Sequence, residues 1–230
     1  MKLAIMQPYF FPYIGYFQLI KAVDKFIFYD DVNYITRGWI NRNRVLLNGE
    51  AHYITIHQKG ASQNKLINEI EIIDNRSKIK KTIVNAYSRA PYFKSVWPLV
   101  EGILDFKTDR ISELASYSVI QSCNYLGIDT KFEFSSKDYA QTVNLKLEKR
   151  LIAICKANSA FDYINPIGGV ELYKKETFVE NRINLSFLRP KSIIYSQFRN
   201  AFVENLSIID LIMFNSYENL QVALSCFEIL

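Results

Sequence analysis

Aromatic residues, two prolines and a glycine crowd the segment QPYFFPYIGYF at residues 7–17, directly after the first hydrophobic stretch of the chain. Open α/β sheets bind ligands where their strands end, so side chains at such a junction are placed to meet a substrate. The helix expected to begin here would add free N–H groups and a positive dipole end, which suit an anion. We therefore predict a site at this junction. Its catalytic candidates are Gln7, Tyr13 and Tyr16, and its binding candidates are Pro8, Tyr9 and Gly15.

The spacing of Tyr13, Gly15 and Tyr16 resembles a nucleotide-binding motif. Nucleotidylyltransferases and pantothenate synthetase carry His-x-Gly-His at the start of the helix after their first strand, where both histidines donate to ATP phosphates. The segment here keeps that frame with tyrosine in place of histidine, and a phenol donates a hydrogen bond but carries no positive charge. The alternative interpretation is that both tyrosines only pack the start of the helix.

Three arginines and two asparagines lie in residues 37–44, shortly after an acidic pair. Guanidinium and amide groups are planar donors that suit phosphate or carboxylate. If the segment is extended, alternation places Arg42 and Arg44 on one side. We predict that the arginines hold phosphates, that the tryptophan stacks on a base or sugar, and that either aspartate orients an amine or a metal. The binding candidates are Arg37, Trp39, Asn41, Arg42, Asn43 and Arg44, and the catalytic candidates are Asp30 and Asp31. A solvated loop with a strand behind it is the alternative.

Two later segments are candidates for the wall of the same pocket. Gly168 and Gly169 follow an expected strand, and paired glycines permit positive φ and a close approach of the backbone to a ligand. A plain turn is the alternative. Tyr195 and Gln197 would continue the wall.

Histidine and cysteine are expected to contribute little chemistry. His52 and His57 are the only histidines, and we place them five apart on one strand, facing opposite sides, so we predict no metal site there. Cys123, Cys155 and Cys226 are scattered through helical segments, and we interpret them as buried, reduced thiols.

The elements that would position the site alternate between strand and helix. Residues 2–7, 14–23 and 25–30 predict a strand, a helix and a second strand, which together make a parallel βαβ unit. Asn48-Gly49, between expected strands at 45–47 and 52–57, is a hairpin signal. The later expected strands are 131–134, 161–165 and 185–188, with a strand or loop at 193–198. The later expected helices are 79–88, 93–106, 110–125 (stopped by Gly127), 145–157, 171–181 and 208–214.

The composition is that of a folded protein, with 49% hydrophobic and 22% charged residues among 230. We predict a single α/β domain over residues 1–230, with a mainly helical insertion at about 74–127. The net charge of +5 is not gathered into a Lys/Arg block, so nucleic acid is not an expected partner. No apolar run approaches the roughly 20 residues of a membrane span, and no signal peptide is evident, so we expect a cytoplasmic protein.

Taken together, MQPYFFPYIGYFQLI and YDDVNYITRGWINRNRVLLNG resemble the WbqC-like family. AYSRAPYF, YLGIDTKFEFSS, NPIGGVELY and LSIIDLIMFN agree, so the resemblance spans nearly the whole chain. YITIHQKG departs from it, because an apolar residue and a proline are expected near His57. Members of this family sit among genes for O-antigen and related surface glycans, often beside genes for nucleotide-linked amino sugars.

The resemblance implies a Rossmann-like parallel sheet of nucleotidylyltransferase-like (HUP-type) topology, a fold shared with an ATP-using synthetase that forms amides. It implies a cytoplasmic enzyme that transfers an acyl or aminoacyl group to a nucleotide-linked amino sugar during surface-polysaccharide synthesis. The expected partners are the nucleotide-linked sugar and a small acyl or amino acid donor, and a homodimer is left open. The cofactor is unknown, with ATP and magnesium as the candidate. The alternative is a non-catalytic nucleotide-sugar-binding or scaffold protein of the same pathway.

Overall fold

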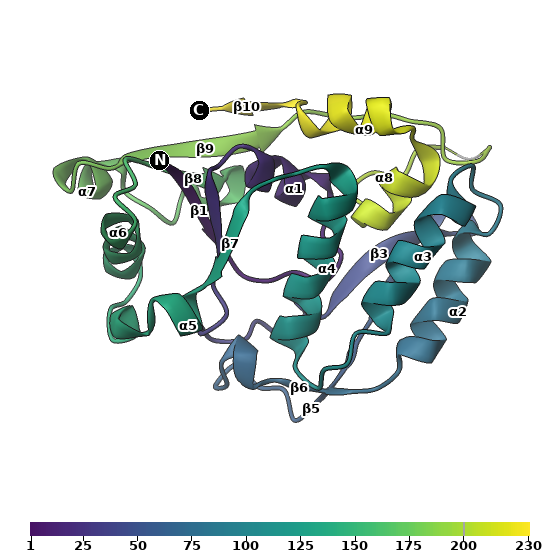
Figure 1. Cartoon of the computed structure of the whole chain (residues 1–230), viewed down its shortest axis with the longest axis horizontal. Coiled ribbons are helices and arrows are strands. Elements are labelled where there is room, and N and C mark those ends of the chain that lie inside the picture. The colour runs from purple at the N-terminus through teal and green to yellow at the C-terminus, as the bar shows by residue number, and fades with distance from the viewer. Residues whose placement is uncertain (200) are drawn as a thin grey trace.

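The computed structural model describes residues 1–199 and 201–230, and a six-stranded sheet lies at its centre (Figure 1). The order across the sheet is β10-β9-β8-β1-β2-β7. The strands from β9 to β7 run parallel, and β10 pairs antiparallel with β9 at one edge. The strand bounds are β1 Lys2–Met6, β2 Lys25–Phe28, β7 Lys131–Phe134, β8 Asp162–Pro166, β9 Asn184–Pro190 and β10 Phe227–Ile229. The predicted α/β class with a mostly parallel sheet is confirmed.

The first βαβ unit forms as the sequence predicts. β1 and β2 are adjacent and parallel, with Ala4 opposite Phe26, and α1 (Ile14–Lys21) connects them. Tyr13 is the N-cap of α1. From β1 the chain moves outward to β2 and β7, and then returns to β8 on the other side of β1. The strand order therefore reverses between β1 and β8, and the crevice beyond the carboxyl ends of strands at such a reversal is the usual ligand site of open α/β sheets.

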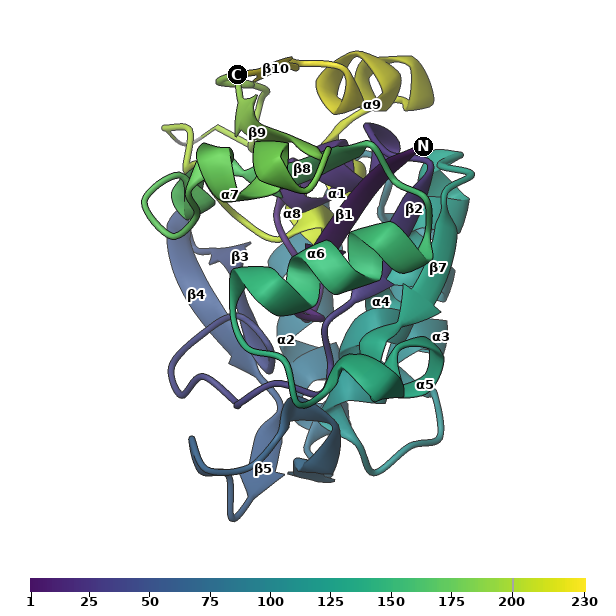
Figure 2. The ribbon, with the colours of Figure 1, turned by 90° about the vertical axis from the view of Figure 1, so that its left-hand side faces the viewer.

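Helices cover both faces of the sheet (Figures 1 and 2). On one face α1 packs in a large core together with α4 (Ile111–Leu126) and the C-terminal helices. On the other face α6 packs in a smaller core with the opposite sides of β1 and β8. Figure 2 shows α6 and α7 in front of the sheet, on the side away from α4. The helix bounds are α5 Ser135–Asp138, α6 Glu148–Ala157, α7 Lys175–Glu180, α8 Ile208–Phe214 and α9 Tyr217–Leu224.

A long insertion, residues 29–130, lies between β2 and β7. It begins with a hairpin whose turn, Asn48-Gly49, has positive φ at both residues, as a type I′ turn requires. A second two-stranded ladder and three helices follow, and the last helix ends at Gly127 with φ 68. The bounds are β3 Arg42–Leu47, β4 Glu50–Thr55, β5 His57–Lys59, β6 Glu71–Ile73, α2 Arg76–Tyr87, α3 Phe93–Leu104 and α4 Ile111–Leu126.

Some expected boundaries differ from the structure. The strand expected at 52–57 breaks at buried Ile56, whose N–H donates to the Asn41 carbonyl at 2.8 Å, so His57 belongs to a different ladder from His52. The two histidines therefore do not share a strand, and the prediction that they face opposite sides of one strand is wrong. α6 begins at Glu148 rather than at residue 145, because Leu147 has φ 50 and cannot continue into a right-handed helix.

The remaining differences lie in the C-terminal half of the chain. α7 covers only Lys175–Glu180 of the helix expected at 171–181, and residues 193–198 form neither a strand nor a helix. No helix in the described parts of the chain is long and apolar enough to cross a bilayer.

Candidate functional site

A cavity of about 370 Å³ lies beside the turn that follows β1. We call it the Arg44 cavity. It brings together five of the residues that the sequence predicts for the site. The lining consists of Tyr9, Pro12, Tyr13, Trp39, Asn43, Arg44 and Asn205.

Backbone contacts explain why these separate segments meet at the Arg44 cavity. The Phe10 N–H donates to the Trp39 carbonyl at 3.1 Å, and the Asn43 side-chain amide donates to the Phe10 carbonyl at 3.2 Å. The turn after β1 is thereby tied both to the loop before β3 and to β3 itself. The Ser207 N–H donates to the carbonyl of Arg44 at 2.8 Å, which brings the start of α8 to the same place.

Arg44 has an unused donor at this cavity. Its Nη2 donates to the Asn205 carbonyl at 2.9 Å, but its Nε is buried and has no hydrogen-bond partner among the described residues. A buried donor without an acceptor carries a desolvation cost, which an acceptor on a ligand would remove. The guanidinium lies 5.7 Å from the Trp39 ring, and that ring stacks on Tyr53. The cavity therefore offers a flat aromatic surface beside an arginine that needs an anion or a carbonyl.

The tyrosines after β1 act as neutral donors at neutral pH. Burial raises the pKa of Tyr9, Tyr13 and Tyr16 above the ordinary value, so each phenol stays protonated. Tyr16 is buried in the core, where its hydroxyl donates to the Gln7 carbonyl at 2.7 Å. The Tyr13 ring lies over Gly15, where a Cβ would be 2.5 Å from the ring. Tyr13 thus lines the cavity, whereas Tyr16 and Gly15 do not.

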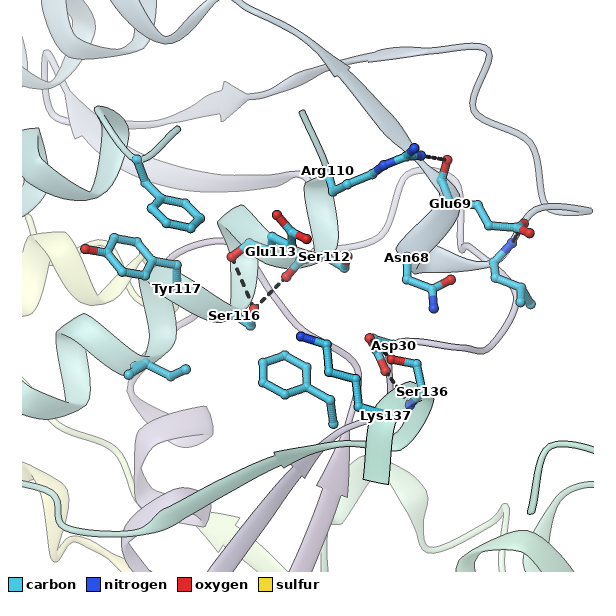
Figure 3. A pocket seen from close by; sticks show the side chains of 14 residues that line it. Asp30, Asn68, Glu69, Arg110, Ser112, Glu113, Ser116, Tyr117, Ser136 and Lys137 are labelled. Carbon is cyan, nitrogen blue, oxygen red and sulfur yellow. Dashed lines mark hydrogen bonds between the residues drawn. The ribbon is translucent and has the colours of Figure 1, made fainter. Parts of the chain in front are cut away.

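A second and larger cavity, of about 690 Å³, lies beyond the ends of β2 and β7, and we call it the Asp30 cavity. Figure 3 shows residues of α4 facing residues of α5 across it, with Asn68 and Glu69 on a third side. The lining is Asp30, Leu66, Asn68, Glu69, Phe106, Arg110, Ser112, Glu113, Ser116, Tyr117, Ile120, Phe134, Ser136 and Lys137.

The acidic pair expected to orient an amine or a metal is engaged by the protein itself. Asp30 accepts hydrogen bonds from the Ser136 N–H at 3.0 Å and the Ser136 hydroxyl at 2.7 Å, and Ser135 shares its one hydroxyl proton between Asp30 and Asp31. Asp31 accepts from Ser135 and forms a buried ion pair with Arg150, with Nη2 to Oδ2 at 2.5 Å. The two carboxylates therefore fix α5 and α6 to the end of β2, and only Asp30 lines a cavity.

Three other predicted binding residues hold the loop before β3. The guanidinium of Arg42 lies over the Tyr53 ring and donates to the carbonyls of Gly38 and Arg37. The Asn41 amide donates to the Ile56 carbonyl at 2.9 Å. None of these side chains lines the Arg44 cavity. The expected convergence of Arg37, Asn41 and Arg42 with Tyr13 is therefore absent, because Arg42 and Asn41 donate to backbone carbonyls of the loop before β3 and of Ile56.

The glycines after β8 form a short 3₁₀ turn, Ile167–Gly169, and neither takes the left-handed conformation that the sequence suggested. Gly169 does have a packing reason, since a Cβ there would be 2.8 Å from the Asn165 amide. Gln7 and Pro8 follow β1 at the same end of the sheet. Gln7 is partly buried, and Pro8 is buried. Neither of them, nor either glycine, lines the Arg44 or the Asp30 cavity.

Tyr195 and Gln197 converge on a buried carboxylate that the sequence did not single out. The Tyr195 hydroxyl and the Gln197 amide donate to Asp210 Oδ2 at 2.7 and 2.6 Å, and the Tyr87 hydroxyl donates to Oδ1 at 2.9 Å. Asp210 is fully buried, and burial raises the pKa of its carboxyl. This network joins α2, α8 and the segment before α8, and Tyr195 also borders a smaller cavity next to Tyr13.

The histidines and cysteines take no part in either cavity. His52 and His57 are exposed. Cys123 and Cys155 are buried, and burial raises the pKa of both thiols, which makes them poor nucleophiles. Within residues 1–199 and 201–230, no group of three or more His, Cys, Asp or Glu side chains is arranged to hold a metal.

Most residues of the Asp30 cavity were not predicted from the sequence. Asn68, Ser116 and Lys137 come from three segments that lie far apart in the chain and meet only in the folded structure. One signal was available: Ser135, Ser136 and Lys137 directly follow the expected strand at 131–134, which is the same kind of junction as the turn after β1.

Comparison with known proteins gives two matches. The model of the WbqC-like protein family matches residues 7–222. The uncharacterized protein Rv1507c of Mycobacterium tuberculosis is 30% identical over 218 residues, which cover 92% of this chain and 92% of that protein. No solved structure matches the chain, so the HUP-type topology stays a prediction with which the observed strand order is compatible.

Proposed function

This chain belongs to the WbqC-like protein family, and we propose that it transfers an acyl or aminoacyl group to the amine of a nucleotide-linked amino sugar. The product would serve the synthesis of O-antigen or another surface polysaccharide. We place the reaction in the cytoplasm, where such nucleotide-linked precursors are made, and on a HUP-type sheet. The gene context implied by the family resemblance supports the pathway, and the Arg44 cavity supports the substrate class.

The observation that carries the proposal is the unpartnered Nε of Arg44 beside the Trp39 ring. A diphosphate supplies oxygens that accept from a guanidinium, and a base or sugar ring supplies a face that stacks on an indole. The position after β1 also fits, because Tyr13, which lines the cavity, is the N-cap of α1 at the positive end of that helix. A nucleotide-linked sugar combines these two kinds of group in one molecule.

The reaction is an ordinary acyl transfer. The amine nitrogen attacks the carbonyl carbon of an activated acyl donor such as a thioester; the C–N bond forms, the C–S bond breaks, and the amine proton leaves with the thiol. Tyr13 and Tyr9 would donate hydrogen bonds to the substrate, since burial keeps both phenols protonated. The protein's contribution would be binding and orientation, which alone can lower such a barrier substantially.

ATP would supply the activation if the donor were a free carboxylic acid. Arg44 fits a phosphate oxygen, but the acidic pair does not fit a magnesium site. Asp31 is neutralised by Arg150, and the oxygens of Asp30 accept from the serines of α5. We therefore propose no step that runs through magnesium at Asp30 or Asp31.

A second candidate is a protein that binds a nucleotide-linked sugar without catalysis. One observation favours it: neither a carboxylate nor a histidine lines the Arg44 cavity, so among the described residues none there would act as a base at neutral pH. The two candidates share the ligand and differ in whether a product forms.

The experiment is a calorimetric titration of the purified protein with UDP-glucosamine and UDP-N-acetylglucosamine. The Arg44→Ala variant should bind about tenfold more weakly or worse, because a contact to a charged group is worth about 1.5–3 kcal/mol. Arg37→Ala is the matched control. Its side chain is exposed and does not line the Arg44 cavity, so the affinity of this variant should equal that of the wild type.

The second arm incubates the protein with UDP-glucosamine and acyl thioesters, and follows the sugar nucleotide by mass spectrometry. A mass increase of one acyl group, lost in Arg44→Ala, would support the transferase. Binding without any product would support the second candidate, a protein that binds the nucleotide-linked sugar without catalysis. No binding of either nucleotide at about 1 mM would refute both candidates.

A further inference from the structure

The geometry points to a second binding site, in the Asp30 cavity, for a small molecule that carries a primary ammonium group at one end and an anionic group at the other. Amino acids and amino-sugar phosphates share this chemistry. The inference uses no residue of the Arg44 cavity, and its test uses no nucleotide. It therefore stands or falls independently of the proposed function.

The first observation is a buried carboxylate without a cation. Asp30 is 4% exposed, and among the described residues it has only hydroxyl and N–H donors and no lysine or arginine within ion-pair distance. The neighbouring buried carboxylate, that of Asp31, does have a counter-charge, because it pairs with Arg150 at 2.5 Å. A buried charge without a counter-charge is costly, and a ligand cation would offset that cost.

The second observation is an unused acceptor on the same wall. The Oδ1 atom of Asn68 is buried and has no hydrogen-bond donor among the described residues. The backbone N–H of Asn68 donates to the carbonyl of Asp30 at 2.9 Å, so the two residues are neighbours. Figure 3 shows both side chains on the same side of the cavity. Within the described chain, Asp30, which lacks a cation, and Asn68 Oδ1, which lacks a donor, lie side by side. Together they suit an ammonium group, which has three donors and no acceptor.

A cation without an anionic partner in the described parts of the chain lies at the rim of the cavity. Lys137 is exposed there, extends from α5 toward α4 (Figure 3), and makes no hydrogen bond or ion pair among the described residues. Its ammonium lies 5.1 Å from the Phe134 ring, and Phe106 stacks on Tyr117 in another part of the wall. A ligand anion would meet Lys137 while the body of the ligand packs on these rings.

The size of the cavity agrees with a small organic ligand. Its volume of about 690 Å³ lies within the range of about 300–1,000 Å³ that small-molecule sites occupy. Ser112 and Ser116 are buried in the α4 wall, and the Ser116 hydroxyl donates to the Ser112 carbonyl at 2.8 Å. The lone pairs of that hydroxyl stay available to further donors on a ligand.

The test is a calorimetric titration with two pairs of probes. One pair is glucosamine 6-phosphate and N-acetylglucosamine 6-phosphate, and the other is L-glutamate and N-acetyl-L-glutamate. Acetylation removes the positive charge and leaves the anion in place. The free amine of at least one pair should bind about tenfold more tightly than its acetylated form, and the pair that binds identifies the source of the ammonium group.

Asn68→Ala is the variant of choice, because it removes Oδ1, a buried acceptor that has no donor within the described residues. Its removal should weaken amine binding about tenfold and leave the thermal midpoint of unfolding unchanged or higher. Lys137→Met should weaken binding of the same ligand, and Lys131→Met at the start of β7 is the matched control that should not. Equal binding of the amine and acetylated forms, no binding of any probe at about 10 mM, or no effect of Asn68→Ala on affinity would each overturn the inference.

Discussion

Removing the carboxylate of Asp31 is expected to destabilise the protein by about 3–5 kcal/mol, the usual cost of leaving one member of a buried ion pair without its partner. The side chains of Asp31 and Arg150 are only 7% and 3% exposed, and their closest atoms are 2.5 Å apart. The guanidinium also donates to Thr142 at 3.2 Å and lies 4.9 Å from the Tyr29 ring, so it cannot reach water without breaking these contacts.

For a chain of this length a loss of 1 kcal/mol lowers the melting temperature by about 2–4 °C, so Asp31→Ala should lower it by about 6–20 °C. Circular dichroism during heating, and urea unfolding at fixed temperature, would measure the effect. Arg150→Met alone should also destabilise the protein. The double variant Asp31→Ala, Arg150→Met should lose much less than the two single losses combined, because neither charge is then left unpaired.

A melting temperature for Asp31→Ala close to that of the wild type would refute this reasoning. If such a variant also lost the activity proposed above, the catalytic role that the sequence suggested for Asp31 would be favoured again. Additive losses in the double variant would show that the two side chains contribute independently, and the ion pair would then not explain their burial.

Three further predictions follow from single residues. Gly15→Ala should weaken binding in the Arg44 cavity at little cost in stability, because the new Cβ would lie 2.5 Å from the Tyr13 ring and push that flexible side chain aside. Titration would measure the loss of affinity, and melting curves would measure the change in stability. Asp210→Asn should remove a pH dependence of the free energy of unfolding. Burial raises the pKa of the Asp210 carboxyl in the folded state, so between the ordinary and the raised pKa the folded state binds more protons than the unfolded state. The stability of the wild type therefore falls as the pH rises through that window. Urea unfolding across pH would show a shallower slope for the variant, and an unchanged slope would contradict the assignment. Leu147→Gly should stabilise the protein by about 1 kcal/mol in urea unfolding, because Leu147 is exposed and has φ 50, and an equally large loss would mean that its side chain matters more than its backbone.

The local parts of the fold were predictable because their signals lie in neighbouring residues. The hydrophobic pattern around α1 places it between two parallel strands, and Asn48-Gly49 specifies the hairpin turn. The burial along β3 alternates between Arg42, Asn43 and Arg44, as an extended segment requires. Each of these conclusions needs a window of only a few residues.

The role of each polar residue was harder to predict, because it depends on partners far along the chain. Asp30 and Asp31 look like free catalytic acids in sequence, yet their partners Ser135 and Arg150 lie more than 100 residues away. Arg42 and Arg44 are equivalent in the pattern, but Arg42 folds back on its own loop while Arg44 faces a neighbour from before α8. Sequence spacing gives the type of group available and not the group that neutralises it.

The place of β1 in the sheet also has a consequence for how the protein is made. β1 pairs with β2 within the first 28 residues. The other neighbour of β1 is β8, which begins at residue 162, and the other neighbour of β2 is β7, which begins at residue 131. At about 5–20 residues per second, a ribosome needs about 5–20 s to produce the insertion that separates β2 from β7. During that interval a nascent two-stranded ribbon carries hydrophobic, unpaired edges. Such edges are targets for aggregation, so in the cell the yield of this protein should depend on chaperones that cover them.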